Sequence, residues 1–542
     1  MNALTHNPLL LRAQRQSARL RRAPWALLAM ITMLSLLVGA VGGIAAESSD
    51  SPAEIGTTLY WVFFVIAGWL VSASGAAMGA HGIASEHQGR TWEALLLTGM
   101  SPRRIVASKL VAAYVNVTLY TVALAPVATV AFVFGGVSAL ELALGFLFVL
   151  GLALLGVTFG LAVGAVVPQF GAVLALVASL PAYGFLGIGF VGTVGNFAVP
   201  RMWPSVNFSS TPVWWPALVA RAPFGLEYML YAWILPLYGL CAVGWLLFES
   251  AVAQVTEAGQ DRLFSYKRAL AICLSVWTFL CLIALAVTTT WDQVTAVLIG
   301  GISVLCAFAA HTLYLAADDV YPARRARHHL ANASALRALF GPGVVRATIL
   351  HLLLWMLSLV LVSVVGLWRA HGLAASTSDY GRLVGAMLCG DSYAIAFALA
   401  SGGLMVLLRA RRMPVLGARV ITFVSIVAVS LAPWVLVAIV GGLTGDSRTL
   451  RVLAAPSPAY MITMIDELRA YNPDPNLIFG GVVMCAFYVL AAQVMFFVAA
   501  RRSRAGLASE LAYQRSVDER MAEEDAQAAA ASEPGAQERD DA

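Results

Sequence analysis

The stretch LALGFLFVLGLALLGVTFGLAVGAVV, residues 142–167, decides the class of fold. It holds no charged residue, and it exceeds the roughly 20 apolar residues that a helix needs to cross a bilayer core. Its apolar residues are continuous rather than alternating, which excludes a strand of a membrane barrel. The stretch therefore predicts a membrane-spanning helix.

Similar apolar runs recur along the 542-residue chain and predict an all-α, polytopic membrane protein with about twelve transmembrane helices. The fourth and fifth spans are separated only by a turn around Pro168 and Gly171. The expected spans are residues 24–45, 57–83, 110–134, 142–167, 172–191, 226–247, 269–289, 294–315, 345–368, 383–408, 420–443 and 478–500.

The composition of the whole chain supports this class. Hydrophobic residues make up 60% of the chain and charged residues only 12%, whereas a soluble domain has about 25% charged residues. These values exclude a soluble nucleic-acid-binding protein, a secreted disulfide scaffold and a disordered protein. The six cysteines all lie in apolar runs without metal-ligand spacing, so we expect neither a metal site nor a cofactor in this chain.

The distribution of basic residues predicts how the chain is inserted. With a cytoplasmic N-terminus, 27 of the 34 Lys and Arg residues lie in segments inside the cell and seven in segments outside. Membrane proteins keep such an excess on the cytoplasmic side. We therefore expect both termini in the cytoplasm and a multi-pass protein of the cell inner membrane.

The two halves of the chain repeat one layout. Each half carries six expected spans and a long outer segment before its sixth span, at residues 192–225 and 444–477. The repeat predicts a 6+6 tandem with both halves in the same orientation. The expected domains are a first half at residues 1–255, a divergent second half at 256–500, and a cytoplasmic tail at 501–542 that is partly helical and then disordered.

The polar segment between the second and third spans reads ASEHQGRTWEALLLTGMSPRRIVASKL, residues 84–110. On a short helix over about residues 89–97, Trp92, Leu95 and Leu96 share one apolar face. Gly99 suits the left-handed cap at the end of that helix. Ser101 and Pro102 are typical of the cap and first position of a new helix, which continues into the third span.

This segment resembles the E-x-x-G-[TR]-x-E-x-L-L-x-T-P-[IVL]-[SR]-R-x-x-[IV]-x-x-K pattern of permease subunits of type-2 ATP-binding-cassette (ABC) transporters. It departs from the pattern at residues 99–102, where many members place proline before a small residue. The second half matches poorly, because its loop at residues 317–346 keeps basic residues but lacks the glutamates. The resemblance is carried by Glu86, Gly89, Arg90, Thr91, Glu93, Leu95, Leu96, Leu97, Thr98, Ser101, Pro102, Arg103, Arg104, Ile105 and Lys109.

The resemblance implies that the loop at residues 84–109 is a coupling helix seated in a groove of a separate ATPase subunit, which we expect in two copies. Mg-ATP would bind to that partner, because this chain has no G-x-x-x-x-G-K-[ST] motif. We therefore expect an ABC exporter permease surrounded by membrane lipid, without enzymatic activity of its own and without nucleic acid. The implied coupling residues are Glu86, Gly89, Arg90, Thr91, Trp92, Glu93, Leu95, Leu96, Ser101 and Pro102.

A secondary transporter of the major facilitator type is the alternative, because that superfamily is also 6+6. Gly82, Glu86, Gly89 and Arg90 approximate its G-x-x-x-D-[RK]-x-G-[RK] loop, but Glu replaces Asp and two basic positions are missing. The long outer segments are also foreign to it. A membrane enzyme is disfavoured by the absence of H-E-x-x-H and G-x-S-x-G, and we expect no catalytic residue.

Asp391 lies well inside the tenth expected span, where a carboxylate is costly unless it faces the bundle interior or a cavity. It is a candidate intramembrane polar site. Two interpretations stay open: a place in a transport path, or a helix contact hydrogen-bonded to nearby Ser392 or Tyr393.

Overall fold

The computed structural model describes most of the expected spans. The residues that it describes form helices joined by turns, and no strand occurs among them. The expected fifth span at 172–191, the outer segment at 192–225 and, in the second half's loop, residues 321–339 lie outside the described residues. The described residues are 22–48, 51–89, 91–97, 99–166, 226, 229–256, 262–320, 340–374, 376–444, 449–469 and 474–532.

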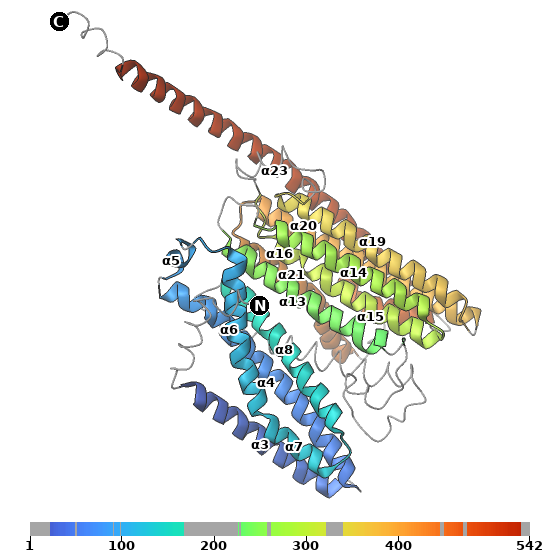
Figure 1. The fold of residues 1–542 in the computed structure, drawn as a ribbon. Helices are drawn as coiled ribbons and strands as arrows, with labels where there is room; N and C mark the ends of the chain where they lie inside the picture. Colours follow the sequence, from blue (N-terminus) through green and yellow to red (C-terminus); the bar gives the residue numbers. More distant parts are fainter. Residues whose placement is uncertain are drawn as a thin grey trace, which may run out of the picture. The chain divides into compact units, whose positions relative to one another are not determined.

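Eleven helices of the described chain are long and apolar enough to cross a membrane, which supports an all-α, multi-pass membrane protein (Figure 1). Eleven of the expected spans overlap them. In chain order the elements that form them are α3 (Arg22–Ser48), α4 (Pro52–Gln88), α6 (Pro102–Ala123) with α7 (Ala125–Phe134), α8 (Ala139–Val166), α13 (Leu235–Val255), α14 (Phe264–Val287), α15 (Trp291–Ala310) with α16 (Thr312–Leu315), α19 (Val344–His371), α20 (Thr377–Ala410), α21 (Val415–Thr444) and α23 (Pro475–Ser532).

Four shorter elements lie outside these spans. They are α5 (Trp92–Leu97), the π-helix η4 (Met229–Ile234), the 3-10 helix η5 (Thr449–Ala454) and α22 (Tyr460–Arg469). The chain groups into two compact units, one made of Met1–His311 with Leu353–Asp391 and one of Thr312–Leu352 with Ser392–Ala542. The expected domain boundaries at residues 255 and 500 stay predictions.

In the first unit, α4 and α8 pack side by side with their backbones in contact (Figure 1). A Cβ atom added to Gly79 would collide with the Val157 carbonyl, and one added to Gly160 would collide with the Ala76 carbonyl. Glycines four positions apart, at 156, 160 and 164, share one face of α8 and let the helices approach this closely. The two helices therefore form one rigid pair.

The third expected span is broken in two. α6 ends at Ala123 and α7 begins at Ala125, with the fully buried Leu124 between them. Pro126 has no backbone N–H to continue the hydrogen-bond ladder of α6, which explains the break.

In the second unit, tyrosines fasten the segment around η5 and α22 to the long helices. The hydroxyl of Tyr393 on α20 donates to the Ala455 carbonyl at 2.9 Å, and that of Tyr460 donates to the Leu477 carbonyl at 2.9 Å. Tyr488 on α23 donates to the Pro456 carbonyl. Burial raises the pKa of Tyr460 from its ordinary value of 10 to about 12.

The last helix, α23, is continuous for 58 residues and runs well past the expected end of the twelfth span at residue 500 (Figure 1). The part beyond that residue is largely exposed as far as residue 528. The cytoplasmic location of this part stays a prediction.

Candidate functional site

The loop between the second and third spans is shorter in the structure than the sequence suggested. α4 continues through Gln88, five residues past the expected end of its span, because the Gly89 N–H still donates to the Ser85 carbonyl at 2.9 Å. The short helix α5 consequently begins at Trp92 rather than near residue 89. The connection is thus a tight turn, α5 and a second turn, with little slack.

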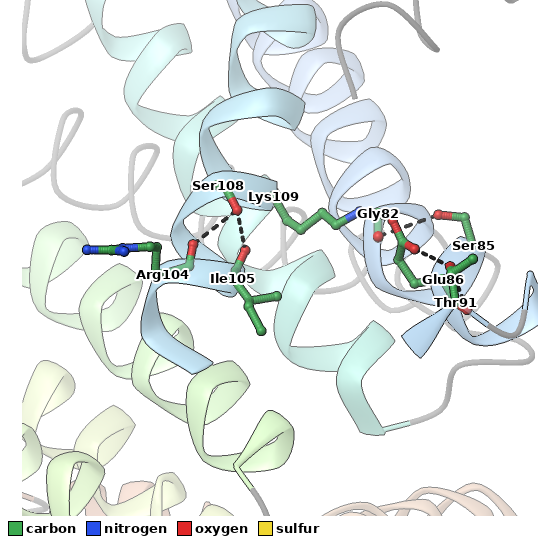
Figure 2. A network of polar contacts seen from close by, with 8 residues as sticks. All are labelled: Gly82, Ser85, Glu86, Thr91, Arg104, Ile105, Ser108 and Lys109. Atoms are coloured by element: carbon green, nitrogen blue, oxygen red, sulfur yellow. Dashed lines mark hydrogen bonds and ion pairs between the residues drawn. The ribbon is translucent and has the colours of Figure 1, made fainter. Parts of the chain in front are cut away.

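Glu86, at the end of α4, is the centre of a polar network (Figure 2). Figure 2 shows the Lys109 side chain reaching from α6 toward the Glu86 carboxylate, with Thr91 on the other side of it. Lys109 Nζ lies 2.5 Å from Glu86 Oε1, and the Thr91 hydroxyl donates to Oε2. The Thr91 N–H also donates to the Glu86 main-chain carbonyl at 3.0 Å. Glu86 therefore joins the start of α5 to both flanking spans.

The ion pair in this network is buried. Only 8% of the Glu86 side chain and 11% of the Lys109 side chain are exposed. Removing one partner of a buried pair leaves an uncompensated charge and costs about 3–5 kcal/mol. The pair therefore makes a stable link between α6 and α4.

The helix α5 presents its leucines differently from the expectation. Leu95 is 5% exposed, so it packs against the chain itself, whereas the neighbouring Leu97 is 87% exposed. The side chains of Arg90, Trp92, Glu93 and Leu96 lie outside the described residues. Leu97 belongs to the sequence pattern but not to the predicted apolar face, because the i, i+3, i+4 spacing from Trp92 selects Leu95 and Leu96 and cannot tell which leucine a neighbouring helix covers.

The turn after α5 has the predicted backbone. Gly99 adopts a left-handed conformation with φ of 70°, which glycine tolerates best. Ser101 is the cap residue of α6 and Pro102 its first residue, as predicted, although the Ser101 side chain makes no capping hydrogen bond in the described chain. The Ser101 carbonyl instead accepts from the Arg104 N–H at 2.9 Å.

A second carboxylate, Glu249 on α13, fastens the first turn of α6. Its side chain is 1% exposed, and its Oε1 lies 2.9 Å from Arg103 Nη2. The Ser265 hydroxyl at the start of α14 donates to Oε2 at 2.8 Å, and Trp245 Nε1 donates to Oε1 at 3.1 Å. The sequence reading missed Glu249, because a single glutamate at the end of an apolar run looks like the beginning of a polar loop.

The two ion pairs join α6, the helix that follows α5, to two other spans. Lys109 connects α6 to α4, and Arg103 connects α6 to α13, whose neighbour α14 supplies Ser265. A short helix with an exposed leucine on such a frame can pass a displacement to several membrane helices.

Asp391 on α20 is half-buried, in the first unit. The Ser363 hydroxyl lies beside it, yet neither Asp391 Oδ1 nor Ser363 Oγ makes a hydrogen bond of normal geometry within the described chain. The Tyr393 hydroxyl donates to Ala455 instead, and Ser392 is exposed. Asp391 therefore remains a candidate polar site without an assigned ligand.

The described residues contain no group of three or more His, Cys, Asp or Glu side chains that could hold a metal ion. No disulfide joins any of the six cysteines, which all lie among the described residues. No known protein-family model matches the chain, and no curated protein or solved structure is significantly similar to it.

Proposed function

We propose that this chain is the membrane-spanning permease of a type-2 ABC exporter, driven by ATP that a separate subunit hydrolyses. The observation that carries the proposal is the geometry of α5. Thr91, directly before this helix, is hydrogen-bonded to Glu86, which pairs with Lys109, and the helix exposes Leu97 within the segment that resembles the family's coupling loop.

The proposed layout follows from the sequence and is compatible with the helices described. The permease has twelve spans in a 6+6 tandem, both termini lie in the cytoplasm, and the inner membrane is its location. The fifth span at residues 172–191 completes the first half. Two copies of the ATPase subunit bind Mg-ATP, and at least one of them receives α5.

The proposed mechanism uses the rigidity of the loop. ATP binding brings the two ATPase subunits together, and the subunit in contact with α5 displaces it. Because α5 has little slack on either side, the displacement reaches α4 through Glu86 and α6 through Lys109. The spans then move relative to each other and open a path for substrate.

Co-purification from native membranes tests this proposal. The wild-type chain should retain a polypeptide that mass spectrometry identifies as a P-loop ATPase and that ATP photolabels. Leu97→Asp should reduce the retained ATPase at least tenfold, because a charge replaces the exposed apolar contact. Leu511→Asp is the matched control, since Leu511 is a partly exposed leucine of α23 in the expected cytoplasmic tail, and this variant should retain the ATPase.

Two results contradict the proposal. One is a wild-type chain that transports with no ATPase bound and responds to membrane potential, which would favour the major facilitator alternative. The other is a Leu97→Asp chain that keeps the ATPase as well as the control does.

A further inference from the structure

The two ion pairs beside α5 differ in how easily they can open. In the Glu86–Lys109 pair both side chains are buried, so separation would strand a charge. In the Glu249–Arg103 pair, Glu249 is 1% exposed but Arg103 is 55% exposed, so the guanidinium is already in contact with solvent. Of the two pairs, only the second has a charged group, the Arg103 guanidinium, that water can solvate when the pair separates.

Glu249 also keeps partners when Arg103 leaves. The Ser265 hydroxyl and the Trp245 indole N–H each donate to one of its two oxygens, independently of Arg103. A carboxylate with two remaining donors is far less costly to leave behind than one with none. The site thus accommodates both a closed and an open arrangement of Arg103.

The placement of the two pairs on α6 separates their targets. Arg103 and Lys109 are six positions apart, so on a helix they point in different directions. Lys109 reaches α4, which is locked to α8 by the glycine contacts, and Arg103 reaches α13. The first turn of α6 therefore lies between a rigid pair of helices and a releasable contact.

We propose that Glu249 is a positioning residue that makes α13 and α14 follow the movement of α5, through its ion pair with Arg103. This inference rests on the proposed function and deepens it. While the pair is closed, a displacement of α5 and the start of α6 pulls α13 through Glu249 and α14 through Ser265. Once the pair opens, the start of α6 loses its polar link to α13 and α14, and these helices follow the loop only through the packing of α13 on α6 and α8.

A distance measurement between spin labels tests the inference. The labels replace Leu147 on α8 and Phe279 on α14, which are exposed residues of the same unit, in a chain whose native cysteines are changed to alanine. The labelled chain is purified with its ATPase in lipid nanodiscs and measured with and without Mg-ATP plus vanadate. In the wild type the nucleotide should shift the distance between the labels.

The variants separate positioning from a general loss of structure. Glu249→Gln and Arg103→Gln should bind the ATPase like the wild type but lose more than half of the nucleotide-dependent shift. Glu249→Asp, which keeps the charge, should restore at least half of the shift. Arg104→Gln is the matched control, because Arg104 is exposed and points away from Glu86 in Figure 2, and it should keep the full shift.

The Arg103→Gln variant is included in case Glu249→Gln fails to fold. It changes an exposed side chain and leaves Glu249 hydrogen-bonded to Ser265 and Trp245. A full shift in both Arg103→Gln and Glu249→Gln, with the ATPase bound, overturns the inference and leaves the proposed function intact. A wild-type chain that binds no ATPase overturns the proposed function and this inference with it.

Discussion

The expected inner ends of the two units use their arginines on different partners. In the first unit, Arg103 pairs with the buried carboxylate of Glu249, just as Lys109 pairs with Glu86. In the second unit, Arg419 donates to the main-chain carbonyls of Leu313 and Tyr314 at 3.1 and 3.0 Å. Arg409 likewise donates to the carbonyls of Met413 at 2.6 Å and Asp318 at 3.3 Å.

The difference teaches what each end is built to do. An arginine that donates to main-chain carbonyls, as Arg419 does at α16 and Arg409 does in two turns, satisfies groups that would otherwise lack a partner, and so it fixes local shape. A carboxylate pair joins side chains of separate helices and can pass a displacement between them. The tyrosines of the second unit also donate to main-chain carbonyls, at Ala455, Pro456 and Leu477. The polar contacts around η5 and α22 therefore fix local shape in the same way as the arginines of that unit do.

The largest effect is expected from breaking the rigid pair to which the first unit's loop is fastened. Gly160→Leu should destabilise the protein by about 3 kcal/mol or more, because the side chain would collide with the Ala76 backbone, which cannot move aside. Gly151→Leu on the same helix should be tolerated, since a Cβ there meets nothing within 4 Å. Thermal unfolding in detergent, followed by size-exclusion chromatography, checks both; equal stability of the two variants would contradict the close contact.

Next in size is the loss of the buried ion pair. Lys109→Met should cost about 3–5 kcal/mol, because the Glu86 carboxylate would stay buried without its cation. Adding Glu86→Gln should recover much of that loss in the double variant. Melting temperatures of the single and double variants, with Arg104→Gln as the exposed control, measure the coupling, and additive effects would show that the two side chains do not depend on each other.

A smaller effect, confined to stability, is expected at the second unit's arginine caps. Arg419→Gln should cost about 1.5–3 kcal/mol, the range for hydrogen bonds to a charged donor. It should leave ATPase retention unchanged, because the contacts of the arginine with the Leu313 and Tyr314 carbonyls and with the Tyr314 ring all lie within its own unit. Co-purification of the ATPase and a thermal melt of the same variant check this. Loss of the ATPase from a folded variant would contradict the proposed difference between the arginines of the two units.

The smallest effect concerns the tyrosine contacts of the second unit. Tyr460→Phe should cost about 1 kcal/mol at neutral pH through the lost bond to Leu477. The folded pKa of about 12 lies above the ordinary value of 10, so the unfolded chain ionises first and stability falls as pH rises from 10 to 12. Unfolding measured across that range should show a shallower fall in Tyr460→Phe than in the wild type, and parallel curves would contradict the assignment.

The sequence predicted much of the fold because spans and caps are local properties. Eleven expected spans overlap observed helices. Gly99 has the predicted left-handed backbone, and Pro102 is the first residue of α6 as predicted. The polar contacts of the loop were not predictable in the same way. Glu86 and Lys109 both belonged to the pattern, but nothing in one sequence says that they touch.

Other features depend on tertiary packing alone. Glu249 meets Arg103 only because α13 packs against α6, and no spacing in the sequence records that contact. The burial of Leu95 and the exposure of Leu97 are decided by which neighbour covers α5. Asp391 was recognisable as a costly group, but its surroundings on α19 and α20 were not.

The central claim is that α5 is the contact surface for an ATPase subunit, and photo-crosslinking from position 97 tests it most directly. Leu97 is replaced by a benzophenone amino acid in the full chain, and native membranes are irradiated. The account predicts an adduct whose second component is a P-loop ATPase, absent when the same amino acid replaces Leu511. Adducts with lipid alone, or with a protein that binds no nucleotide, would contradict it.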